Sequence, residues 1–518
     1  MKSLTKILPT TDLLLAFSAV IAVCFYVLVA NGGFPLDDSW IHQVYGRNLA
    51  QTGVWSFIPG VPSAASTSPL YTVLLSLGYK LGLDYRFWTH FLGIIALGVS
   101  AVLAAHLTSR LLPGRRVISF LGGLVVVGAW HLVWAAASGM ETMLFSMWTL
   151  VLITLTWREW DNQQPLNTTT LLLRGALFGA SAALSTITRP EGIVLAGIAG
   201  ILILVARPHD TFSKLLIWIA GAGLAFLVFV APYLALNIQL TGGLLPDTAA
   251  AKQAEYAPLL LESYPVRFWN MLLPLLASAA LFLLPGIVYY TIVIIKQVSS
   301  NHKQILALLP VFWSLALVAL YAARLPAYYQ HGRYVIPALP ALLVVGFIGT
   351  VWLIRNGSRS MLSRVLTRSV ALSFLIGALY FFVQGAWIYK QDVAIIDQEM
   401  VTSARWIQAN IPPEDLLAVH DIGAVGYFAP RPILDLAGLV SPEIVPFILD
   451  GDALWNWLQE KDARYLMAFP EHIPGDDPRN DVNDPRLCPV FTSGGTASLQ
   501  SGGPNMVIYA FNWGEGCP

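Results

Sequence analysis

The sequence predicts a helical membrane protein with many spans, followed by a small α/β domain at its C-terminal end. Three observations predict this class. The 518 residues are 56% hydrophobic and only 12% charged, with a mean hydropathy of +0.64, a composition that soluble globular domains do not have. Apolar stretches long enough to cross a bilayer recur along the first three quarters of the chain. From about residue 390 the hydropathy falls and short strand and helix patterns replace them.

The first apolar stretch, residues 13–30, follows a short basic start that contains Lys2 and Lys6. It is a little shorter than the roughly 20 residues needed to cross the hydrocarbon core. Because no small-residue cleavage site follows it, we interpret it as a retained signal anchor rather than a removed signal peptide.

Ten further apolar stretches bring the expected number of spans to eleven. Two of the eleven, 142–156 and 192–206, are short for a span. The ten stretches lie at residues 87–109, 117–137, 142–156, 171–188, 192–206, 215–236, 271–295, 304–322, 335–354 and 369–389.

The Lys and Arg residues predict the orientation of the chain. They gather in every second connection between the expected spans, as with Arg115 and Arg116, or Arg364 and Arg368. Connections rich in these residues stay in the cytoplasm. We therefore expect the N-terminus inside, the C-terminal domain outside, and a multi-pass location in the cytoplasmic membrane.

The alternate, outer connections hold the conspicuous polar residues of the membrane part. Ionisable groups at the edges of spans are costly unless they are paired or line a wet cavity, so their collection on one side predicts a functional site there. These candidate site residues are Asp37, Asp38, Glu141, Arg189, Glu191, Asp247, Lys252, His331 and Arg333.

The adjacent carboxylates of Asp37 and Asp38 open the stretch "DDSWIHQVYGRNLA", which has helical spacing. Either aspartate can cap the N-terminus of this helix. Capping explains only one of them, because two neighbouring carboxylates repel each other unless a cation or a proton offsets the repulsion. The helix has an apolar stripe suited to the membrane interface, made of Ile41, Val44, Tyr45 and Leu49.

A second in-plane helix is expected in the same outer loop, beginning at Ser68-Pro69 in "STSPLYTVLLSLGYKLG". Glu141, Arg189 and Glu191 either belong to the functional site or anchor their helices at the membrane interface. Asp247 and Lys252 are equally compatible with an ordinary solvated loop. By contrast, His331 and Arg333 in "YYQHGRYVIPALP" suit the binding of a phosphate at the membrane surface.

The C-terminal region predicts a compact α/β domain. Helices are expected in "DVAIIDQEMVTSARWIQANIP" and "DGDALWNWLQEKDA", and strands in "DLLAVHD", "RPILDLAG", "RYLMAFP" and "NMVIYAFNW". "HDIGAVGYF" has the wrong spacing for a nucleotide-binding loop, so we interpret it as a strand and turn. Cys488 and Cys517 either form a disulfide, if the domain faces an oxidising compartment, or remain free thiols.

Several function classes lack support. The chain has 30 Lys and Arg against 30 Asp and Glu and no long basic run, which argues against a nucleic-acid partner. The sequence contains no P-loop, no GxSxG motif and no zinc-finger spacing.

Seven stretches, taken in order, resemble a bacterial family of polytopic GT-C glycosyltransferases. The first-loop acidic pair is similar to that of the protein O-mannosyltransferase and mycobacterial arabinofuranosyltransferase groups. The resemblance runs from about residue 34 to 445. It implies a GT-C catalytic membrane domain at 1–389 and an extracytoplasmic domain at 390–518. The stretches are "DDSWIHQVYGRNLAQTG", "TSPLYTVLLSLGYKLG", "SGMETMLFSMWTL", "TRPEGIVLAG", "GGLLPDTAAAK", "HGRYVIPALP" and "DIGAVGYFAPRPILDLAGLVSPEI".

The resemblance implies a hexosyl- or pentosyltransferase that inverts the sugar. It would move the sugar from a polyprenyl-phosphate donor to a hydroxyl of a cell-envelope glycan, lipid or protein. One carboxylate of the first-loop pair would be the general base, either Asp37, which we choose, or Asp38, and the other would orient the acceptor or hold a cation. The leaving phosphate would be stabilised by Arg189, Lys252, His331 and Arg333.

Three points stay open. A divalent cation such as Mg²⁺ or Mn²⁺ is compatible with Asp37 and Asp38, since hard cations favour carboxylates. The chain has "SAASTSPL" where related sequences carry an acidic residue, which puts a contribution of that position in doubt. The competing function is a transporter or flippase of a lipid-linked saccharide, whose polar residues should lie on both sides of the membrane midplane.

Overall fold

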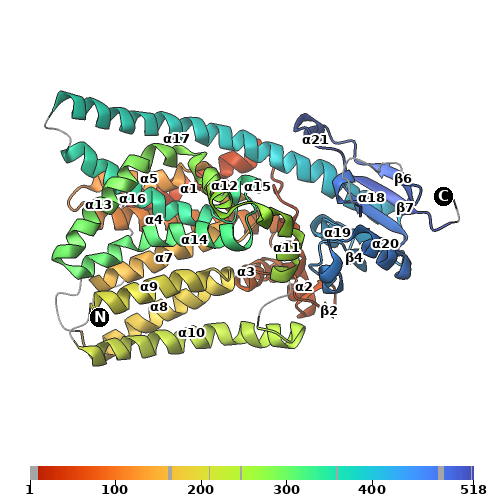
Figure 1. The fold of residues 1–518 in the computed structure, drawn as a ribbon, viewed down its shortest axis with the longest axis horizontal. Helices are drawn as coiled ribbons and strands as arrows, with labels where there is room; N and C mark the ends of the chain where they lie inside the picture. The colour runs from red at the N-terminus through yellow and green to blue at the C-terminus, as the bar shows by residue number, and fades with distance from the viewer. Residues whose placement is uncertain are drawn as a thin grey trace.

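A computed structural model of the chain describes residues 10–160, 166–208, 211–244, 248–356, 360–475, 484–514 and 516–517. Within these ranges the molecule has two parts. A bundle of apolar helices forms the larger part, and an α/β part closes one end of the bundle (Figure 1).

All eleven predicted stretches are helical along most of their length. Eight helices of the described chain are long and apolar enough to cross a membrane, and α5 and α6 make a ninth if this pair, bent by 57°, is one span. The prediction of a polytopic helical membrane protein is confirmed. The bundle consists of α1 (Thr10–Val29), α4 (Tyr85–Leu111), α5 (Arg116–Val127), α6 (Trp130–Ala137), α7 (Thr142–Trp160), α8 (Thr168–Thr188), α9 (Gly192–Ala206), α10 (Phe212–Thr241), α13 (Leu284–Ser300), α14 (Leu309–Arg324), α16 (Leu339–Asn356) and α17 (Met361–Ile396).

The stretch expected as one span at 271–295 is broken in the structure. Helix α12 (Tyr264–Leu276) ends shortly after Pro274, and a new helical segment begins with η2 (Ala279–Leu283). The hydroxyl of Ser278 accepts a hydrogen bond from the Ala280 N–H at 3.1 Å and so caps the new segment. Because proline supplies no N–H to the helix, and Ser278 provides a start signal, the apolar span is shifted to residues 279–300.

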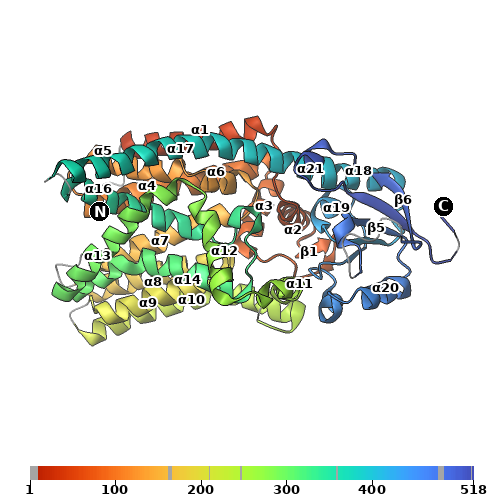
Figure 2. The same cartoon turned by 45° about the horizontal axis from the view of Figure 1, so that its top comes forward.

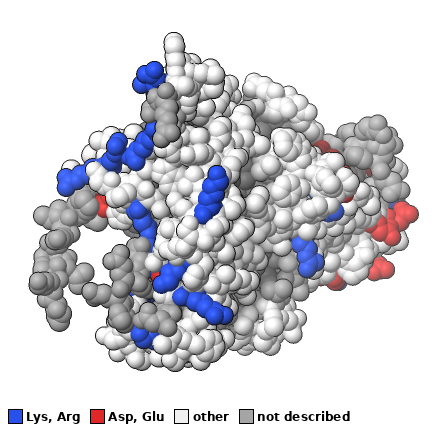
Figure 3. All heavy atoms as spheres, turned by 60° about the vertical axis from the view of Figure 1, so that its left-hand side comes forward, with Lys and Arg blue, Asp and Glu red and all other residues white. Residues whose placement is uncertain are grey.

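Lys and Arg side chains gather at the end of the bundle that faces away from the α/β part (Figure 3). The element bounds explain this, because the cations stand at the ends of α4, α7 and α16 and at the starts of α5, α10 and α17. Alternating helices place these ends together. The predicted gathering of cations in every second connection therefore corresponds to one face of the molecule.

The first outer loop carries α2 (Asp38–Thr52), a small hairpin of β1 (Ser56–Ile58) and β2 (Val61–Pro62), and α3 (Pro69–Lys80). Both predicted helices are present. They lie between the bundle and the α/β part, as Figure 2 shows. The apolar stripe of α2 does not face the membrane interface, because Ile41, Val44 and Tyr45 are buried in one cluster with side chains of the α/β part.

Helix α17 runs without a break from the bundle into the α/β part, through the π-helical segment η6 (Asp397–Val401) to α18 (Thr402–Asn410) (Figure 1). The predicted boundary at 389/390 falls inside this helix and stays a prediction. A five-stranded sheet follows, with order β4-β3-β5-β7-β6. β3 is parallel to β4 and to β5, whereas β7 is antiparallel to β5 and to β6. The strands are β3 (Leu417–Val419), β4 (Ile433–Asp435), β5 (Tyr465–Ala468), β6 (Leu487–Thr492) and β7 (Val507–Phe511).

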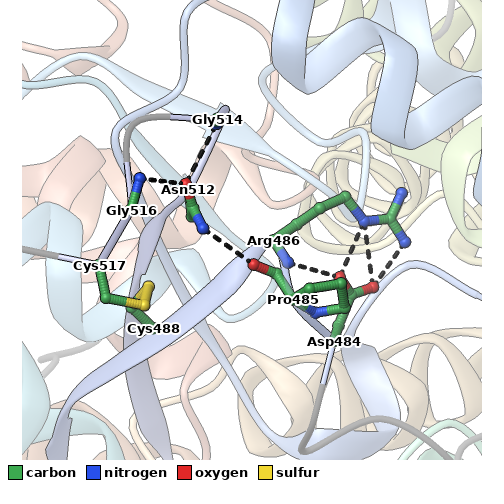
Figure 4. Close-up of a disulfide and its surroundings, with 8 residues drawn as sticks. All are labelled: Asp484, Pro485, Arg486, Cys488, Asn512, Gly514, Gly516 and Cys517. Atoms are coloured by element: carbon green, nitrogen blue, oxygen red, sulfur yellow. Dashed lines mark hydrogen bonds and ion pairs between the residues drawn. A yellow bond between two sulfur atoms is a disulfide. The ribbon is translucent and has the colours of Figure 1, made fainter.

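The two C-terminal cysteines form a disulfide, with 5.6 Å between the Cα atoms of Cys488 and Cys517. The bridge ties β6 to the segment after β7 (Figure 4). Asn512 reinforces the same connection, because its side chain donates to the Pro485 carbonyl and accepts from the Gly514 and Gly516 N–H groups. Of the two alternatives that the sequence left open, the structure shows the disulfide.

Candidate functional site

Asp37 caps a helix, but not the helix that follows it in the chain. Its side chain makes no capping bond to α2. Instead, its two carboxylate oxygens accept hydrogen bonds from the N–H groups of Gly423 and Ala424, at 2.6 and 2.8 Å. These are first-turn donors of α19 (Ile422–Phe428) in the α/β part. The carboxylate therefore joins the first outer loop to a helix N-terminus, where a negative charge is favoured.

The interpretation of "HDIGAVGYF" as a strand and turn was wrong. A strand, β3, ends just before it, and seven residues from Ile422 form α19. The helix was missed because its periodicity is weak: Ile422, Gly423, Ala424, Val425 and Gly426 are all buried.

The surroundings of Asp37 favour proton uptake. The residue is 8% exposed, and burial together with the nearby Asp421 carboxylate raises the pKa of Asp37 to about 8, although the two backbone N–H groups act in the opposite direction. A carboxylate has about four lone-pair positions, and the helix N-terminus uses two of them. The remaining positions allow Asp37 to accept another hydrogen bond from a hydroxyl.

Gly423 permits the close approach of α19 to Asp37. A Cβ atom at this position would lie 2.1 Å from the Asp37 carbonyl oxygen and 2.8 Å from its Oδ2. We therefore expect Gly423→Ala to displace the Asp37 carboxylate. The variant should still fold, but any activity that depends on Asp37 should fall. Activity and thermal unfolding of the variant would be compared with those of Gly197→Ala, since Gly197 has open space around its Cβ position. Equal activity of the two variants would contradict this expectation.

Asp38 faces two cations. Its Oδ2 lies 2.5 Å from Nη2 of Arg333 and 3.4 Å from Nζ of Lys252. Burial alone would raise the pKa of the Asp38 carboxyl, but Lys252 and Arg333 hold it well below its usual range. The side chains of Asp38 and Lys252 are 27% and 23% exposed, so this ion pair is the most accessible part of the cluster.

A second set of charges lies behind this pair. Glu141 is 3.1 Å from Nε2 of His42 and 3.8 Å from Nε of Arg189. Arg189 also pairs with Glu191 at 3.4 Å and donates to the Tyr321 hydroxyl at 2.6 Å. A buried charge without a partner is energetically costly. The pairing of these side chains with one another accounts for their presence in buried positions.

Tyr334 links the two sets. Its hydroxyl accepts a hydrogen bond from Nη2 of Arg333 at 3.1 Å, and the Arg189 guanidinium lies 5.5 Å from the centre of its ring. Six of the nine predicted site residues therefore form one charged cluster, and Asp37 adjoins it through the chain. The six are Asp38, Glu141, Arg189, Glu191, Lys252 and Arg333.

Arg333 keeps two hydrogen-bond donors free. The residue is 6% exposed, and its Nε and Nη1 atoms have no hydrogen-bond partner among the described residues. Gln330, His331 and Gly332 directly before it all have positive φ angles of 52°, 59° and 66°. Such conformations are costly for residues other than glycine and persist where the surroundings fix them. This tight turn fixes the backbone at Arg333, and the free donors are available for an anion.

Two predicted residues lie elsewhere. His331 points to α17, where its Nε2 is 2.8 Å from Oδ2 of Asp392 and its ring meets those of Trp130 and Trp134. Asp247 lies outside the described residues.

The sequence analysis missed His42, Tyr334 and the N–H groups of α19. A signal for His42 was available, since it stands four residues after Asp38 and so on the same face of α2.

Two places in the described structure hold side chains that could bind a metal: the Asp37–Asp38 pair, and a group of three residues in the α/β part. The oxygens of Asp37 face N–H groups and Oδ2 of Asp38 faces two cations, an arrangement that would have to change before a hard cation could bind there. In contrast, His420, Asp421 and His472 in the α/β part bring three ligand atoms within 4.8 Å of one another.

Comparison with known structures shows the same architecture over almost the whole chain. ArnT from Cupriavidus metallidurans in the apo state superposes with a TM-score of 0.61 at 12% identity, covering 97% of this chain and 98% of ArnT. The apo Archaeoglobus fulgidus oligosaccharyltransferase gives 0.56 at 11% identity, covering 96% and 74%. The chain has the GT-C fold.

The GT-C fold has been solved with lipid phosphates in two of these proteins. ArnT bound to undecaprenyl phosphate superposes with a TM-score of 0.59 at 12% identity, over 97% of this chain and 98% of ArnT. AglB from A. fulgidus, in complex with an inhibitory peptide and a dolichol-phosphate, gives a TM-score of 0.52 at 11% identity, over 88% of this chain and 69% of AglB.

By sequence, a family model described as a domain of unknown function, DUF8728, matches residues 388–509. No curated relative matches.

Proposed function

We propose that the protein transfers a sugar from a polyprenyl-phosphate donor to an acceptor hydroxyl at the outer surface of the membrane. The observation that carries the proposal is the buried guanidinium of Arg333, which has two free donors beside the Asp37–Asp38 pair. A guanidinium with free donors suits a phosphate oxygen. The GT-C fold supports the choice of donor, because ArnT and AglB have been solved with undecaprenyl phosphate and dolichol-phosphate.

The chemistry assigned to Asp37 is general-base catalysis. As the acceptor hydroxyl approaches the anomeric carbon, Asp37 takes its proton, the new carbon–oxygen bond forms, and the bond from the sugar to the phosphate breaks. The incoming oxygen and the leaving phosphate occupy opposite faces of the sugar, so the configuration inverts. A base with a pKa near the working pH suits this step, and the raised pKa of Asp37 supports the assignment.

The role assigned to Asp38 is to position two cations. Arg333 and Lys252 both face its Oδ2, and they would stabilise the charge that develops on the leaving phosphate. Asp38 is a weaker base than Asp37, because the same cations hold its pKa low. This division of roles follows from the different partners of two adjacent carboxylates.

Two features support an outer location for the reaction. The candidate site adjoins the α/β part, at the end of the bundle away from the gathered cations (Figure 3). The Cys488–Cys517 disulfide lies in that α/β part, and disulfides persist in oxidising compartments. By the positive-inside rule, the cation-rich end is cytoplasmic.

The test is release of polyprenyl phosphate by the purified protein in nanodiscs. Polyprenyl-phosphate pentoses and hexoses would be supplied in turn, with membranes from a strain lacking the protein as the source of acceptor. We expect one donor to be consumed with release of the free lipid phosphate. Movement of a donor across the bilayer of sealed proteoliposomes, with its sugar still attached, would instead identify a flippase.

A further inference from the structure

Three metal-ligating side chains meet at one edge of the C-terminal sheet. His420 and Asp421 follow β3 directly, and His472 ends the short η8 helix (Pro470–His472) that follows β5. Since β3 and β5 are parallel neighbours, their carboxyl ends lie at the same edge. The sequence did not reveal this group, because 50 residues separate its two halves and the spacing matches no zinc-finger pattern.

The three ligand atoms face one another without being hydrogen-bonded. Nδ1 of His420 is 3.6 Å, and Nδ1 of His472 is 3.7 Å, from Oδ2 of Asp421. These distances are too long for good hydrogen bonds. All three atoms are buried and have no hydrogen-bond partner among the described residues. The two imidazole rings stack with 3.7 Å between their centres, a costly arrangement if both were protonated.

The outer nitrogen of His420 already has the partner that a metal-binding histidine needs. Its Nε2 lies 3.4 Å from Oε1 of Glu255, at the end of α11 (Thr248–Glu255). A carboxylate on one ring nitrogen holds the proton there and leaves the other nitrogen free to bind a metal. When a metal takes the place of a proton on Nδ1, Glu255 would keep the other ring proton on Nε2, and the Nδ1 lone pair would face the ion.

We propose that Nδ1 of His420, Oδ2 of Asp421 and Nδ1 of His472 bind a divalent transition metal, with Zn²⁺ as the ion that fits best. Two imidazoles and one carboxylate are a common three-residue zinc set, which leaves one coordination position open, whereas Mg²⁺ prefers oxygen ligands. In a tetrahedral site with bonds of about 2.0–2.1 Å, the ligand atoms are about 3.3–3.4 Å apart. The distances to Asp421 Oδ2 need to shorten by a few tenths of an ångström. The two stacked imidazole rings, 23° apart in plane, would have to tilt so that both Nδ1 lone pairs point to the ion.

The metal would fix two elements that reach the candidate catalytic residues. Asp421 stands two residues before Gly423, whose N–H binds Asp37, and Glu255 stands three residues after Lys252, which pairs with Asp38. Binding of the metal itself does not depend on the proposed function. Its consequence for activity does, and it would be exerted by positioning.

The test is the metal content and thermal stability of the full-length, tag-free protein in nanodiscs, stripped with EDTA and then supplied with Zn²⁺, Mn²⁺ or Mg²⁺. We expect one bound equivalent of Zn²⁺ and a higher unfolding temperature with Zn²⁺ than with Mg²⁺. His472→Ala and Asp421→Asn should lose both effects. Glu255→Gln should weaken Zn²⁺ binding about 10- to 100-fold while the ligands stay in place.

The matched control is His302→Ala, which removes an exposed histidine from η3 (His302–Leu308). It should bind Zn²⁺ as the unmodified protein does. If His472→Ala does not fold, Asp421→Asn and Glu255→Gln still decide the outcome. Zn²⁺ binding that is substoichiometric in the unmodified protein, or unchanged in these variants, would overturn the proposal, as would equal stabilisation by Mg²⁺. None of these readouts requires sugar transfer.

Discussion

Replacing Asp37 with asparagine is expected to slow sugar transfer about 100- to 10,000-fold, the range by which a positioned general base accelerates proton transfer. The amide keeps the size of the carboxylate but cannot take a proton from the acceptor hydroxyl. Release of polyprenyl phosphate from the preferred donor would be followed in nanodiscs. Binding of the donor should change little, because the phosphate is assigned to Arg333 and Lys252 on the Asp38 side of the pair.

The same substitution affects the docking of α19, and the experiment has to separate the two effects. An asparagine offers one oxygen to the two N–H groups of Gly423 and Ala424, so one donor loses its acceptor, at a cost of about 1–3 kcal/mol. Thermal unfolding would measure that cost. Asp452→Asn, at an exposed position of α20 (Gly451–Glu460), is the matched control. Wild-type transfer by folded Asp37→Asn protein would remove the base assignment.

The pH profile of the unmodified protein provides an independent readout of the same base. Burial and Asp421 raise the pKa of Asp37 to about 8. Since only the deprotonated carboxylate can accept the proton, kcat/KM of the protein stripped with EDTA should rise with pH and level off above that pKa. A metal on Asp421 would offset its negative charge, so Zn²⁺ should move this limb to lower pH. This ascending limb should be missing from the residual activity of Asp37→Asn.

Hydropathy predicted the helical membrane part well, because it is a property of local stretches of sequence, whereas the orientation predicted from the cations stays a prediction. A span needs only enough consecutive apolar residues, and orientation depends on where the cations stand. The same reasoning placed Asp38, Glu141, Arg189 and Arg333 on one side, and the structure brings them into one charged cluster. Two differences concern the spans: the chain breaks before residue 279, shortly after Pro274, and the helices at the expected spans 142–156 and 192–206 are not among the eight or nine described helices long and apolar enough to cross a membrane.

Contacts between distant parts of the chain could not be predicted in this way. Helical periodicity identified the buried face of α2, but it cannot name the partner, which is the α/β part and not the lipid interface. The capping role of Asp37 was considered for its own helix, whereas the donors come from 386 residues further along the chain. His331 stands two residues from Arg333, yet the left-handed turn between them sends it to Asp392.

Arg333→Gln is expected to have the second largest effect, a loss of about 100- to 1,000-fold in kcat, comparable to removal of one oxyanion-stabilising group. Glutamine removes the charge and one arm of the planar fork. Arg333→Lys keeps the charge but not the fork, so its activity should be intermediate. Free polyprenyl phosphate, used as a competitive inhibitor, should bind both variants more weakly than it binds the unmodified protein.

The loss of activity in Arg333→Gln can be separated from a loss of folding. In that variant Asp38 keeps Lys252 as a partner, and its side chain is 27% exposed to water. Its charge is therefore not left buried and unpaired when Arg333 is removed, and the unfolding temperature should change little. Arg324→Gln, an exposed arginine at the end of α14, is the matched control for loss of positive charge near the site. If Arg333→Gln binds polyprenyl phosphate as tightly as this control does, the free donors of Arg333 do not serve the phosphate, and the observation that carries the proposed function is withdrawn.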